Sequence, residues 1–180
     1  MSIRIVQERL SAAGYDPGPV DGVWGAKTAA ALDKALGLDL DSIDPQLIAD
    51  LKRDEGLRLT AYKDTVGVWT IGYGHAHVAP GTVWTQAQAD AALIDDVRQH
   101  NAELAAALPW VANLDAVRRR VLQNMAFNLG VKGLLGFKNT LGMVQRGDYE
   151  GAARGMLNSL WAKQVKGRAV RLAEQMRTGR

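Results

Sequence analysis

Three residues near the middle of the chain have side chains suited to acid–base chemistry on a polar substrate. Asp64 follows Glu55 by nine residues, and Thr70 follows Asp64 by six. Hydrolysis of a glycosidic bond needs a carboxylic acid that protonates the leaving oxygen, and a carboxylate that activates water or attacks the sugar. The two carboxyl groups could fill these roles from one wall of a cleft, with the Thr70 hydroxyl holding a water. Spacing alone does not distinguish this interpretation from two ordinary surface carboxylates.

The elements predicted around these residues would place them where a helix meets a small sheet. Asp44 as N-cap and Pro45 at the first helical position predict a helix that ends near Gly56. Glu55 would then lie in its last turn. From Ala61 to His75, strand-forming residues punctuated by glycines predict a small hairpin or three short strands.

The remainder of the chain is predicted to be helical. Thr85 and Gln88 form a capping-box pattern at the start of a helix that Pro109 ends near Leu108. Further helices are predicted over 114–129, 137–146, 148–161 and 164–177. The last of these has a basic side and an apolar side of Val170, Leu172, Ala173 and Met176, which favours burial over membrane disruption. The fold class is therefore α+β and mainly α, with a small antiparallel sheet.

The N-terminal stretch is predicted to be a separate helix–loop–helix module. A short helix stops at Gly14, the turn-rich segment 15–25 follows, and a second helix runs from about Ala26 to Leu36. The predicted boundaries are a module over 1–38, a linker over 39–44 and a larger domain over 45–180.

Composition and charge narrow the function classes. The chain has 180 residues and no cysteine, which excludes disulfides and thiolate metal sites. Its three histidines lack a ligand pattern with carboxylates, so neither a metal nor an organic cofactor is expected. Residues 98–180 hold 14 Lys and Arg against 5 Asp and Glu, typical either of a solvated basic face or of a protein with an anionic partner. No nucleic-acid motif accompanies this charge, so nucleic acid is not expected as that partner.

The first residues carry an early charge and no apolar core segment, unlike a secretory signal. The weakly polar stretch from Leu104 to Leu114 is too short to span a bilayer. We therefore expect the protein to accumulate in the cytoplasm of the producing cell. The protein would then reach a target outside the membrane only after another factor opens that membrane.

Several motifs resemble those of phage-type lysozymes of the T-even kind, in their order and approximate spacing. The resemblance covers about residues 45–180. It is carried by 54–59, 62–65, 69–75, 114–119, 124–128 and 136–141, then Trp161, Gln164, Arg168 and 177–179. It implies a lysozyme-like fold and a hydrolase that cleaves between N-acetylmuramic acid and N-acetylglucosamine in peptidoglycan, by inversion through a bound water.

The resemblance also implies roles for individual residues. Glu55 matches the general acid, Asp64 the residue that positions the attacking water, and Thr70 the third member of the triad. Phe127 and Thr140 match positions lining the glycan cleft. His75 matches a mainly structural histidine, and Arg168 a basic residue that pairs with the catalytic glutamate. Two positions depart from the family pattern: a sugar-binding asparagine aligns near Gly155, and Ala76 replaces a larger apolar residue.

The N-terminal stretch resembles the small helical peptidoglycan-binding module of wall-active enzymes. The resemblance rests on Gly14-Tyr15 and on the run from Asp21 to Thr28. It implies Tyr15, Asp21, Trp24 and Thr28 as binding residues, with the stem peptide as a candidate ligand; a helical cap without ligand affinity is the alternative.

Together these features predict a monomeric phage endolysin that acts on the glycan strands of the wall after membrane opening. Two alternatives stay open at this point. One is a lytic transglycosylase that makes anhydromuramic products and needs only the glutamate, and the other is a non-catalytic wall-binding protein. The presence of Asp64 and Thr70 beside Glu55 favours hydrolysis.

Overall fold

A computed structural model of the chain describes residues 2–35, 43–65 and 67–180. The chain divides into two compact units, Met1–Ile43 and Asp44–Arg180. Most of the predicted linker over 39–44 lies outside the described residues. Asp44 belongs to the second unit, where it caps a helix.

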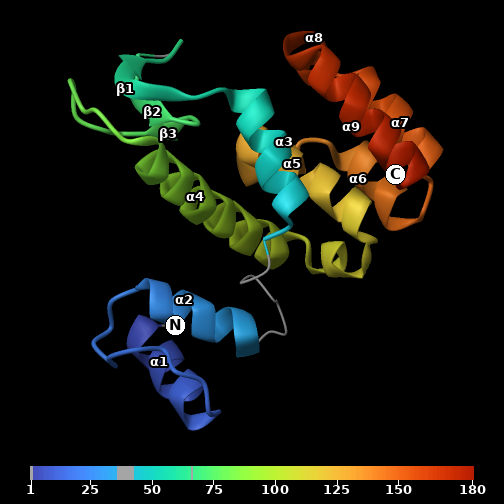
Figure 1. The fold of residues 1–180 in the computed structure, drawn as a ribbon. Coiled ribbons are helices and arrows are strands. Elements are labelled where there is room, and N and C mark those ends of the chain that lie inside the picture. Colours follow the sequence, from blue (N-terminus) through green and yellow to red (C-terminus); the bar gives the residue numbers. More distant parts are fainter. Residues whose placement is uncertain (1, 36–42, 66) are drawn as a thin grey trace. The chain divides into compact units, whose positions relative to one another are not determined.

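The first unit is the predicted helix–loop–helix. Helix α1 (Ile3–Ala12) and helix α2 (Ala26–Ala35) are joined by a long loop (Figure 1). Leu10 of α1 and Ala31 of α2 are buried. The loop begins at Gly14, whose φ of 86° lies in the left-handed region that glycine adopts without strain.

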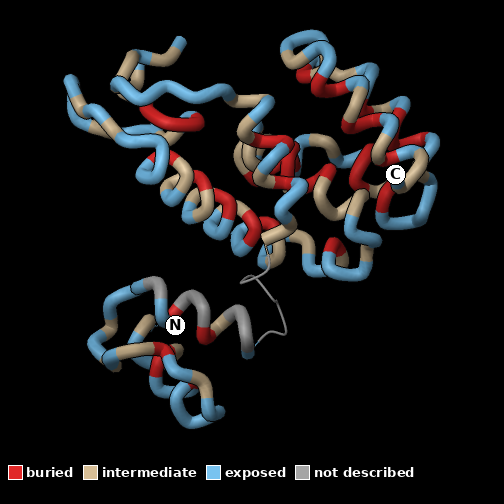
Figure 2. Tube along the Cα trace, viewed as in Figure 1, coloured by how far each residue is buried: buried red, intermediate tan, exposed pale blue. Residues whose placement is uncertain are grey.

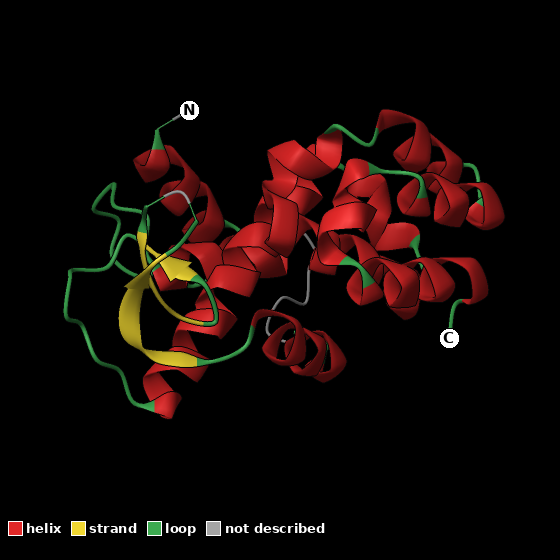
Figure 3. Ribbon diagram, turned by 90° about the horizontal axis from the view of Figure 1, so that it is seen from above, coloured by secondary structure: helices red, strands yellow, loops and turns green. Residues whose placement is uncertain are grey.

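The second unit opens with one helix followed by a three-stranded sheet (Figure 3). Helix α3 (Pro45–Glu55) begins as predicted, with the Asp44 side chain accepting a hydrogen bond from the Gln46 amide. Strands β1 (Arg58–Lys63), β2 (Trp69–Gly72) and β3 (His75–Ala76) pair antiparallel in that order. The first strand starts three residues earlier than Ala61, because Gly56 turns the chain directly from the helix into the sheet.

The rest of the unit is helical, which confirms the mainly α prediction. Helix α4 (Gln86–Ala107) has the predicted capping box, formed by Thr85 and Gln88. The elements that follow are the 3₁₀ helix η1 (Pro109–Asn113) and helices α5 (Ala116–Leu135), α6 (Lys138–Gln145), α7 (Tyr149–Leu157), α8 (Leu160–Val165) and α9 (Gly167–Thr178). The predicted break at Gly130 is a kink inside α5, where φ is 69°.

Two helix predictions near the C-terminus were wrong. The helix predicted over 148–161 is divided into α7 and α8, because the Ser159 side chain accepts a hydrogen bond from the Ala162 amide and starts a new helix. The last helix begins at Gly167 rather than Gln164, after Lys166 adopts a left-handed φ of 48°.

The main core lies among the helices after β3 (Figure 2). Helix α9 turns Leu172, Ala173 and Met176 into this core, as predicted. Val170 was wrongly assigned to that face, since it is 61% exposed. Among the described residues, no helix is both long and apolar enough to cross a membrane.

Candidate active site

Glu55 is the last residue of α3, at the junction between the helix and the sheet. Its Oε1 accepts a hydrogen bond of 2.7 Å from Nη1 of Arg168, the second residue of α9. The Glu55 side chain is 20% exposed and that of Arg168 only 7%. The structure thus places the predicted pair in contact and leaves part of the Glu55 carboxyl open to solvent.

Asn124 of α5 orients Arg168. The Asn124 side-chain oxygen accepts from Arg168 Nε at 2.9 Å, and its main-chain oxygen accepts from Nη2 at 3.2 Å. The remaining nitrogen, Nη1, is the one that meets Glu55. Because the guanidinium is planar, two contacts to one neighbour fix its plane and therefore the position of the third contact.

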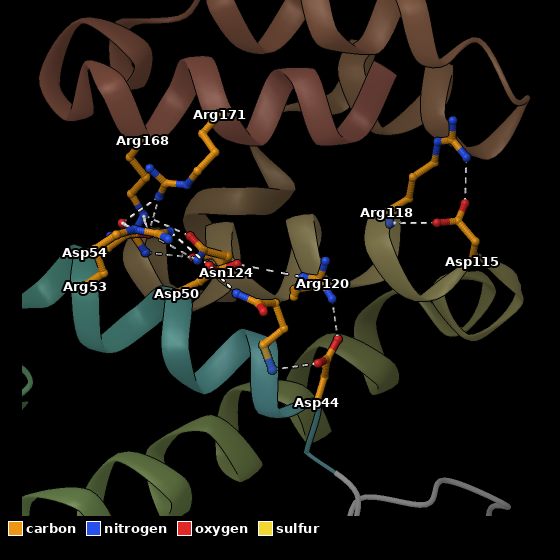
Figure 4. Close-up of polar contacts among 11 residues, drawn as sticks. Asp44, Asp50, Arg53, Asp54, Asp115, Arg118, Arg120, Asn124, Arg168 and Arg171 are labelled. Atoms are coloured by element: carbon orange, nitrogen blue, oxygen red, sulfur yellow. Dashed lines mark hydrogen bonds and ion pairs between the residues drawn. The ribbon is translucent and has the colours of Figure 1, made fainter. Parts of the chain in front are cut away.

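Asp54, beside the predicted acid, completes this group of charges (Figure 4). Its carboxylate accepts from Arg171 Nη2 at 2.6 and 2.8 Å and lies 3.4 Å from Arg168 Nε. Arg53 Nε donates to it at 3.3 Å. The Asp54 side chain is only 5% exposed, so its charge is compensated inside the protein.

Asp64 and Thr70 are brought together by Val68 in the turn between β1 and β2. The Asp64 carboxylate accepts from the Val68 amide at 2.8 Å, and the Val68 carbonyl accepts from the Asp64 amide at 2.9 Å. The same carbonyl accepts from the Thr70 hydroxyl at 3.2 Å. With its proton committed in this way, the buried Thr70 oxygen keeps lone pairs that can accept a hydrogen bond from water.

His75 ties the hairpin to α4. Its Nδ1 lies 2.9 and 3.1 Å from the two carboxylate oxygens of Asp96, and its ring packs 5.3 Å from that of Trp84. These contacts support the structural role implied for His75.

The two predicted cleft residues occupy different surroundings. Phe127 lines a cavity of about 450 Å³ together with residues of β3 and α4. Thr140 is buried on α6 against Gly155 of α7, where an added Cβ would lie 2.6 Å from the Thr140 hydroxyl oxygen. The departure at Gly155 therefore has a local cause, because the Thr140 side chain fills the space that a larger residue would need.

In the first unit, the loop is held by a buried glutamine. The Gln7 side-chain nitrogen donates toward Asp21 Oδ1, the Val23 carbonyl and Thr28 Oγ1 at 3.0–3.1 Å, and its oxygen accepts from the Gly22 amide at 2.8 Å. Asp21 also accepts from the Val23 amide, which together with Gln7 lowers the pKa of its carboxyl.

The four predicted binding residues of this unit divide into two groups. Thr28 is 1% exposed and its hydroxyl donates to the Pro17 carbonyl, so it holds the loop from inside and its contact with a ligand stays a prediction. Tyr15 is half-buried, Asp21 is exposed, and Trp24 is 49% exposed. These three stay available for a ligand.

Sequence reasoning assigned no role to Asp54, Asn124 or Arg171. Their contacts join residues 70 and 117 positions apart, which no local pattern reveals. One signal was available. Arg168 and Arg171 are three residues apart and so share a helix face, and two acids, Asp54 and Glu55, precede the glycine at the helix end.

A small sheet beside a helical lobe, with an arginine-paired glutamate and a hairpin aspartate, defines a lysozyme-like glycoside hydrolase. Residues 52–178 match the phage lysozyme family, and residues 2–35 match a putative peptidoglycan-binding domain. The chain belongs to the phage lysozyme family.

Individual relatives agree with this assignment. A probable T4-type lysozyme of Dictyostelium discoideum is 30% identical over 156 residues, which cover 72% of this chain and 92% of the relative. An endolysin of Acyrthosiphon pisum secondary endosymbiont phage 1 is 37% identical over 127 residues, covering 68% and 82%. The pre-baseplate central spike protein Gp5 of Enterobacteria phage T4 is 32% identical over 156 residues, but this chain spans only 27% of its length.

Proposed function

We propose that Glu55 is the general acid of this enzyme and that Asp64, with Thr70, holds and activates the attacking water. The reaction itself follows from the family. The chain is a glycoside hydrolase, a muramidase of the endolysin type, and peptidoglycan is its substrate. The bond cleaved is the β-1,4 linkage between N-acetylmuramic acid and N-acetylglucosamine.

The observation that carries the residue roles is the difference between the surroundings of the two carboxyl groups. Glu55 is largely buried beside Arg168, whereas Asp64 lies in a turn and is held by a main-chain amide. Glycosidases need two such carboxyl groups in different environments, because one must give a proton while the other stays ionised.

In the proposed reaction, Glu55 gives its proton to the glycosidic oxygen as the bond to the anomeric carbon breaks. A water held by Asp64 and the Thr70 oxygen attacks that carbon from the opposite face and loses its proton to Asp64. Arg168 then stabilises the carboxylate left on Glu55 through the 2.7 Å hydrogen bond. Attack by water from the opposite face inverts the anomeric configuration.

The two other functions considered are not favoured by the family assignment. A lytic transglycosylase would use the substrate's own hydroxyl and would not need a water held by Asp64 and Thr70. A non-catalytic wall-binding protein would not need the Glu55–Arg168 pair. The transglycosylase predicts anhydromuramic products and the wall-binding protein predicts no products, so both can be tested directly.

We propose that the first unit binds the wall through Tyr15, Asp21 and Trp24, with the buried Thr28 supporting the loop through the Pro17 carbonyl. Contact with the stem peptide and a monomeric state also belong to this proposal. We expect the enzyme to act on the wall, because relatives of the chain are named endolysins. Accumulation in the host cytoplasm until the membrane is opened belongs to the same proposal.

The test is mass spectrometry of fragments released from purified peptidoglycan by the wild type, Glu55→Gln and a matched control, Glu150→Gln. Glu150 is an exposed glutamate paired with Arg154 on α7. We expect reducing muramic acid ends from the wild type and the control, and a rate lower by about 10²- to 10⁴-fold for Glu55→Gln. Anhydromuramic ends would indicate a transglycosylase, and undiminished release by Glu55→Gln would remove Glu55 as the acid.

A further inference from the structure

Helix α3 carries two buried carboxylates on one face. Asp50 and Asp54 are one helical turn apart, so their side chains lie on the same side of the helix. These side chains are only 3% and 5% exposed. Asp54 belongs to the group of charges around Glu55, whereas Asp50 takes no part in the proposed reaction. Because a buried carboxylate is costly unless it is paired, the partners of Asp50 are informative.

Helix α5, which contacts α3, presents two polar side chains that are also one turn apart. Asn124 Nδ2 donates to Asp54 Oδ2 at 3.4 Å. One turn earlier, Arg120 Nε lies 3.8 Å from Asp50 Oδ2. Figure 4 shows these contacts between the two helices. Each buried carboxylate of α3 therefore faces one polar group of α5, and a slip of one helix along the other would break both contacts.

Arg120 also holds the beginning of α3. Its Nη1 donates to Asp44 Oδ2 at 2.6 Å, while Asp44 Oδ1 accepts from the Gln46 amide as the helix cap. The Gln46 side chain in turn donates to Asp50 Oδ1 at 3.0 Å. The Arg120 side chain is 12% exposed, so solvent screens its charge only weakly. One guanidinium of α5 thus contacts both the cap of α3 and its first buried carboxylate.

The contact between Arg120 and Asp50 consists of charge attraction without a hydrogen bond. Arg120 Nε and Asp50 Oδ2 are both buried, and neither has a hydrogen-bond partner within the described part of the chain. At 3.8 Å they are too far apart for a hydrogen bond but close enough for a strong attraction in a buried setting. Because each atom is the complement of the other, movement of α3 away from α5 raises the free energy.

The position of α3 determines where the Glu55 carboxyl lies. Glu55 is the last residue of this helix, five residues or about 7.5 Å along the axis from Asp50. Its partner Arg168 belongs to α9 and is oriented by Asn124 of α5. The acid and its partner are therefore carried by different helices, and the 2.7 Å contact between them depends on how α3 sits on α5.

We propose that Arg120 is a positioning residue, which acts through Asp44 and Asp50 to hold Glu55 in register with Arg168. The proposal rests on the function assigned to Glu55 above. Hydrophobic burial is non-directional, whereas a buried ion pair can define one register of two helices. A misplacement of about 1 Å at a reacting group can lower the rate by about 10²-fold. A loss of register should therefore lower kcat and leave strand binding unchanged.

The first test is steady-state kinetics on solubilised glycan strands, at a temperature where each protein is fully folded. We expect Arg120→Met to lower kcat about tenfold and Asp50→Asn about threefold, with KM within about twofold of the wild type. Asp50→Asn keeps the shape of the side chain, so it tests the proposal even where Arg120→Met fails to fold. Arg120→Lys should recover part of kcat, because it keeps a positive charge beside the two carboxylates.

Arg119→Met is the matched control. Arg119 is the adjacent, half-buried arginine of α5, and it lies about 100° around the helix from Arg120. We expect its kcat and KM to stay within about twofold of the wild type. Wild-type kcat in folded Arg120→Met and Asp50→Asn would overturn the proposal, and so would a rise in KM alone. Undiminished activity of Glu55→Gln would instead be a failure of the proposed function.

The second test does not depend on turnover. The Glu55 carboxyl carbon signal and the Arg168 Nε–H signal are followed by NMR in the wild type and in each variant. We expect both signals to shift in Arg120→Met and in Asp50→Asn, and to keep their wild-type positions in Arg119→Met. Signals that stay unmoved in the first two variants would show that α3 keeps its register without Arg120, which would overturn the proposal.

Discussion

Each unit of the molecule is organised by one buried polar side chain, but the two side chains differ in charge. In the first unit, the neutral amide of Gln7 holds the loop through Asp21, Gly22, Val23 and Thr28. In the second, the Arg168 guanidinium joins α3, α5 and α9. A loop that only presents a surface needs a fixed shape, which a neutral amide supplies. In the proposed mechanism, the fixed positive charge of Arg168 stabilises the Glu55 carboxylate that remains after proton transfer.

The largest expected effect comes from removing that charge. Arg168→Met would leave Asp54 and Glu55 without their shared partner in a largely buried setting. We expect the free energy of unfolding of the second unit to fall by about 3–5 kcal/mol, because breaking a buried ion pair leaves an uncompensated charge. Denaturant unfolding measures this loss, together with the loss of hydrolysis.

Arg154→Met is the matched control for Arg168→Met. Arg154 pairs with Glu150 on the surface of α7, where both side chains are more than half exposed. Such a pair contributes about 0–1 kcal/mol. A similar loss in both variants would contradict the view that burial gives Arg168 its importance.

The next largest effect is expected from replacing the neutral Gln7 side chain of the first unit. Gln7→Leu removes the acceptor of the Gly22 amide and one of the two hydrogen bonds of the Thr28 hydroxyl, which keeps its bond to the Pro17 carbonyl. We expect this unit to lose about 2–3 kcal/mol of stability, since unsatisfied buried polar groups are costly. Sedimentation with insoluble peptidoglycan should show weaker binding, while hydrolysis of soluble strands stays at the wild-type rate.

Gln7→Glu tests the same comparison between a neutral and a charged buried side chain, because it replaces the Gln7 amide with a titratable carboxyl group. The introduced carboxylate would lie beside Asp21, whose folded pKa is already lowered. Both groups are charged above pH of about 4–5, so repulsion should weaken wall binding at neutral pH and relax as the pH falls. Binding that does not change with pH in this variant would show that the loop tolerates a charged centre.

The smallest effect is expected at a half-exposed charged group in the second unit. Asp90 accepts from the Tyr73 hydroxyl at 3.0 Å and pairs with Lys52 Nζ at 2.8 Å. The Lys52 hydrogen bond lowers the pKa of Asp90, and the same contact raises the pKa of Lys52. Asp90→Asn should therefore cost under about 1 kcal/mol.

The pH dependence of this last effect gives a check on its cause. A carboxyl whose folded pKa is lowered stabilises the fold above its unfolded pKa of about 3.9, and this contribution disappears as the pH falls through the folded value. Wild type and Asp90→Asn should thus differ at pH 6 and converge below about pH 3. Thermal unfolding across this pH range measures the stability difference between the two proteins. A difference that stays constant with pH would indicate that it comes from packing instead.

Local signals in the sequence predicted the elements that depend on local contacts. The Asp44 cap and the Thr85 capping box lie where expected, because a cap needs only residues within one turn. The break between α7 and α8 was missed, because no glycine or proline lies between Leu157 and Leu160 to mark it. Val170 was placed on the wrong face, because at about 100° per residue it lies about 160° around the helix from the buried Leu172.

In the candidate site too, the residues found from local signals differ from those that depend on tertiary contacts. Glu55, Asp64 and Thr70 lie within sixteen residues of one another and came from a local motif. Asp64 and Thr70 are held locally by Val68, but the groups that orient Glu55 come from α5 and α9, and their contacts depend on tertiary packing. Burial of Thr28 was missed for the same reason, since its partner Gln7 lies 21 residues away.

Helix α4 has a mechanical consequence for the width of the site. Its 22 residues give a length of about 33 Å at 1.5 Å per residue. Near one end Asp90 holds the hairpin residue Tyr73, and near the other Leu104 is fixed in the helical core. If the helix tilts as a rigid body by about 5° at its core end, its hairpin end moves by about 3 Å, roughly the diameter of a water molecule.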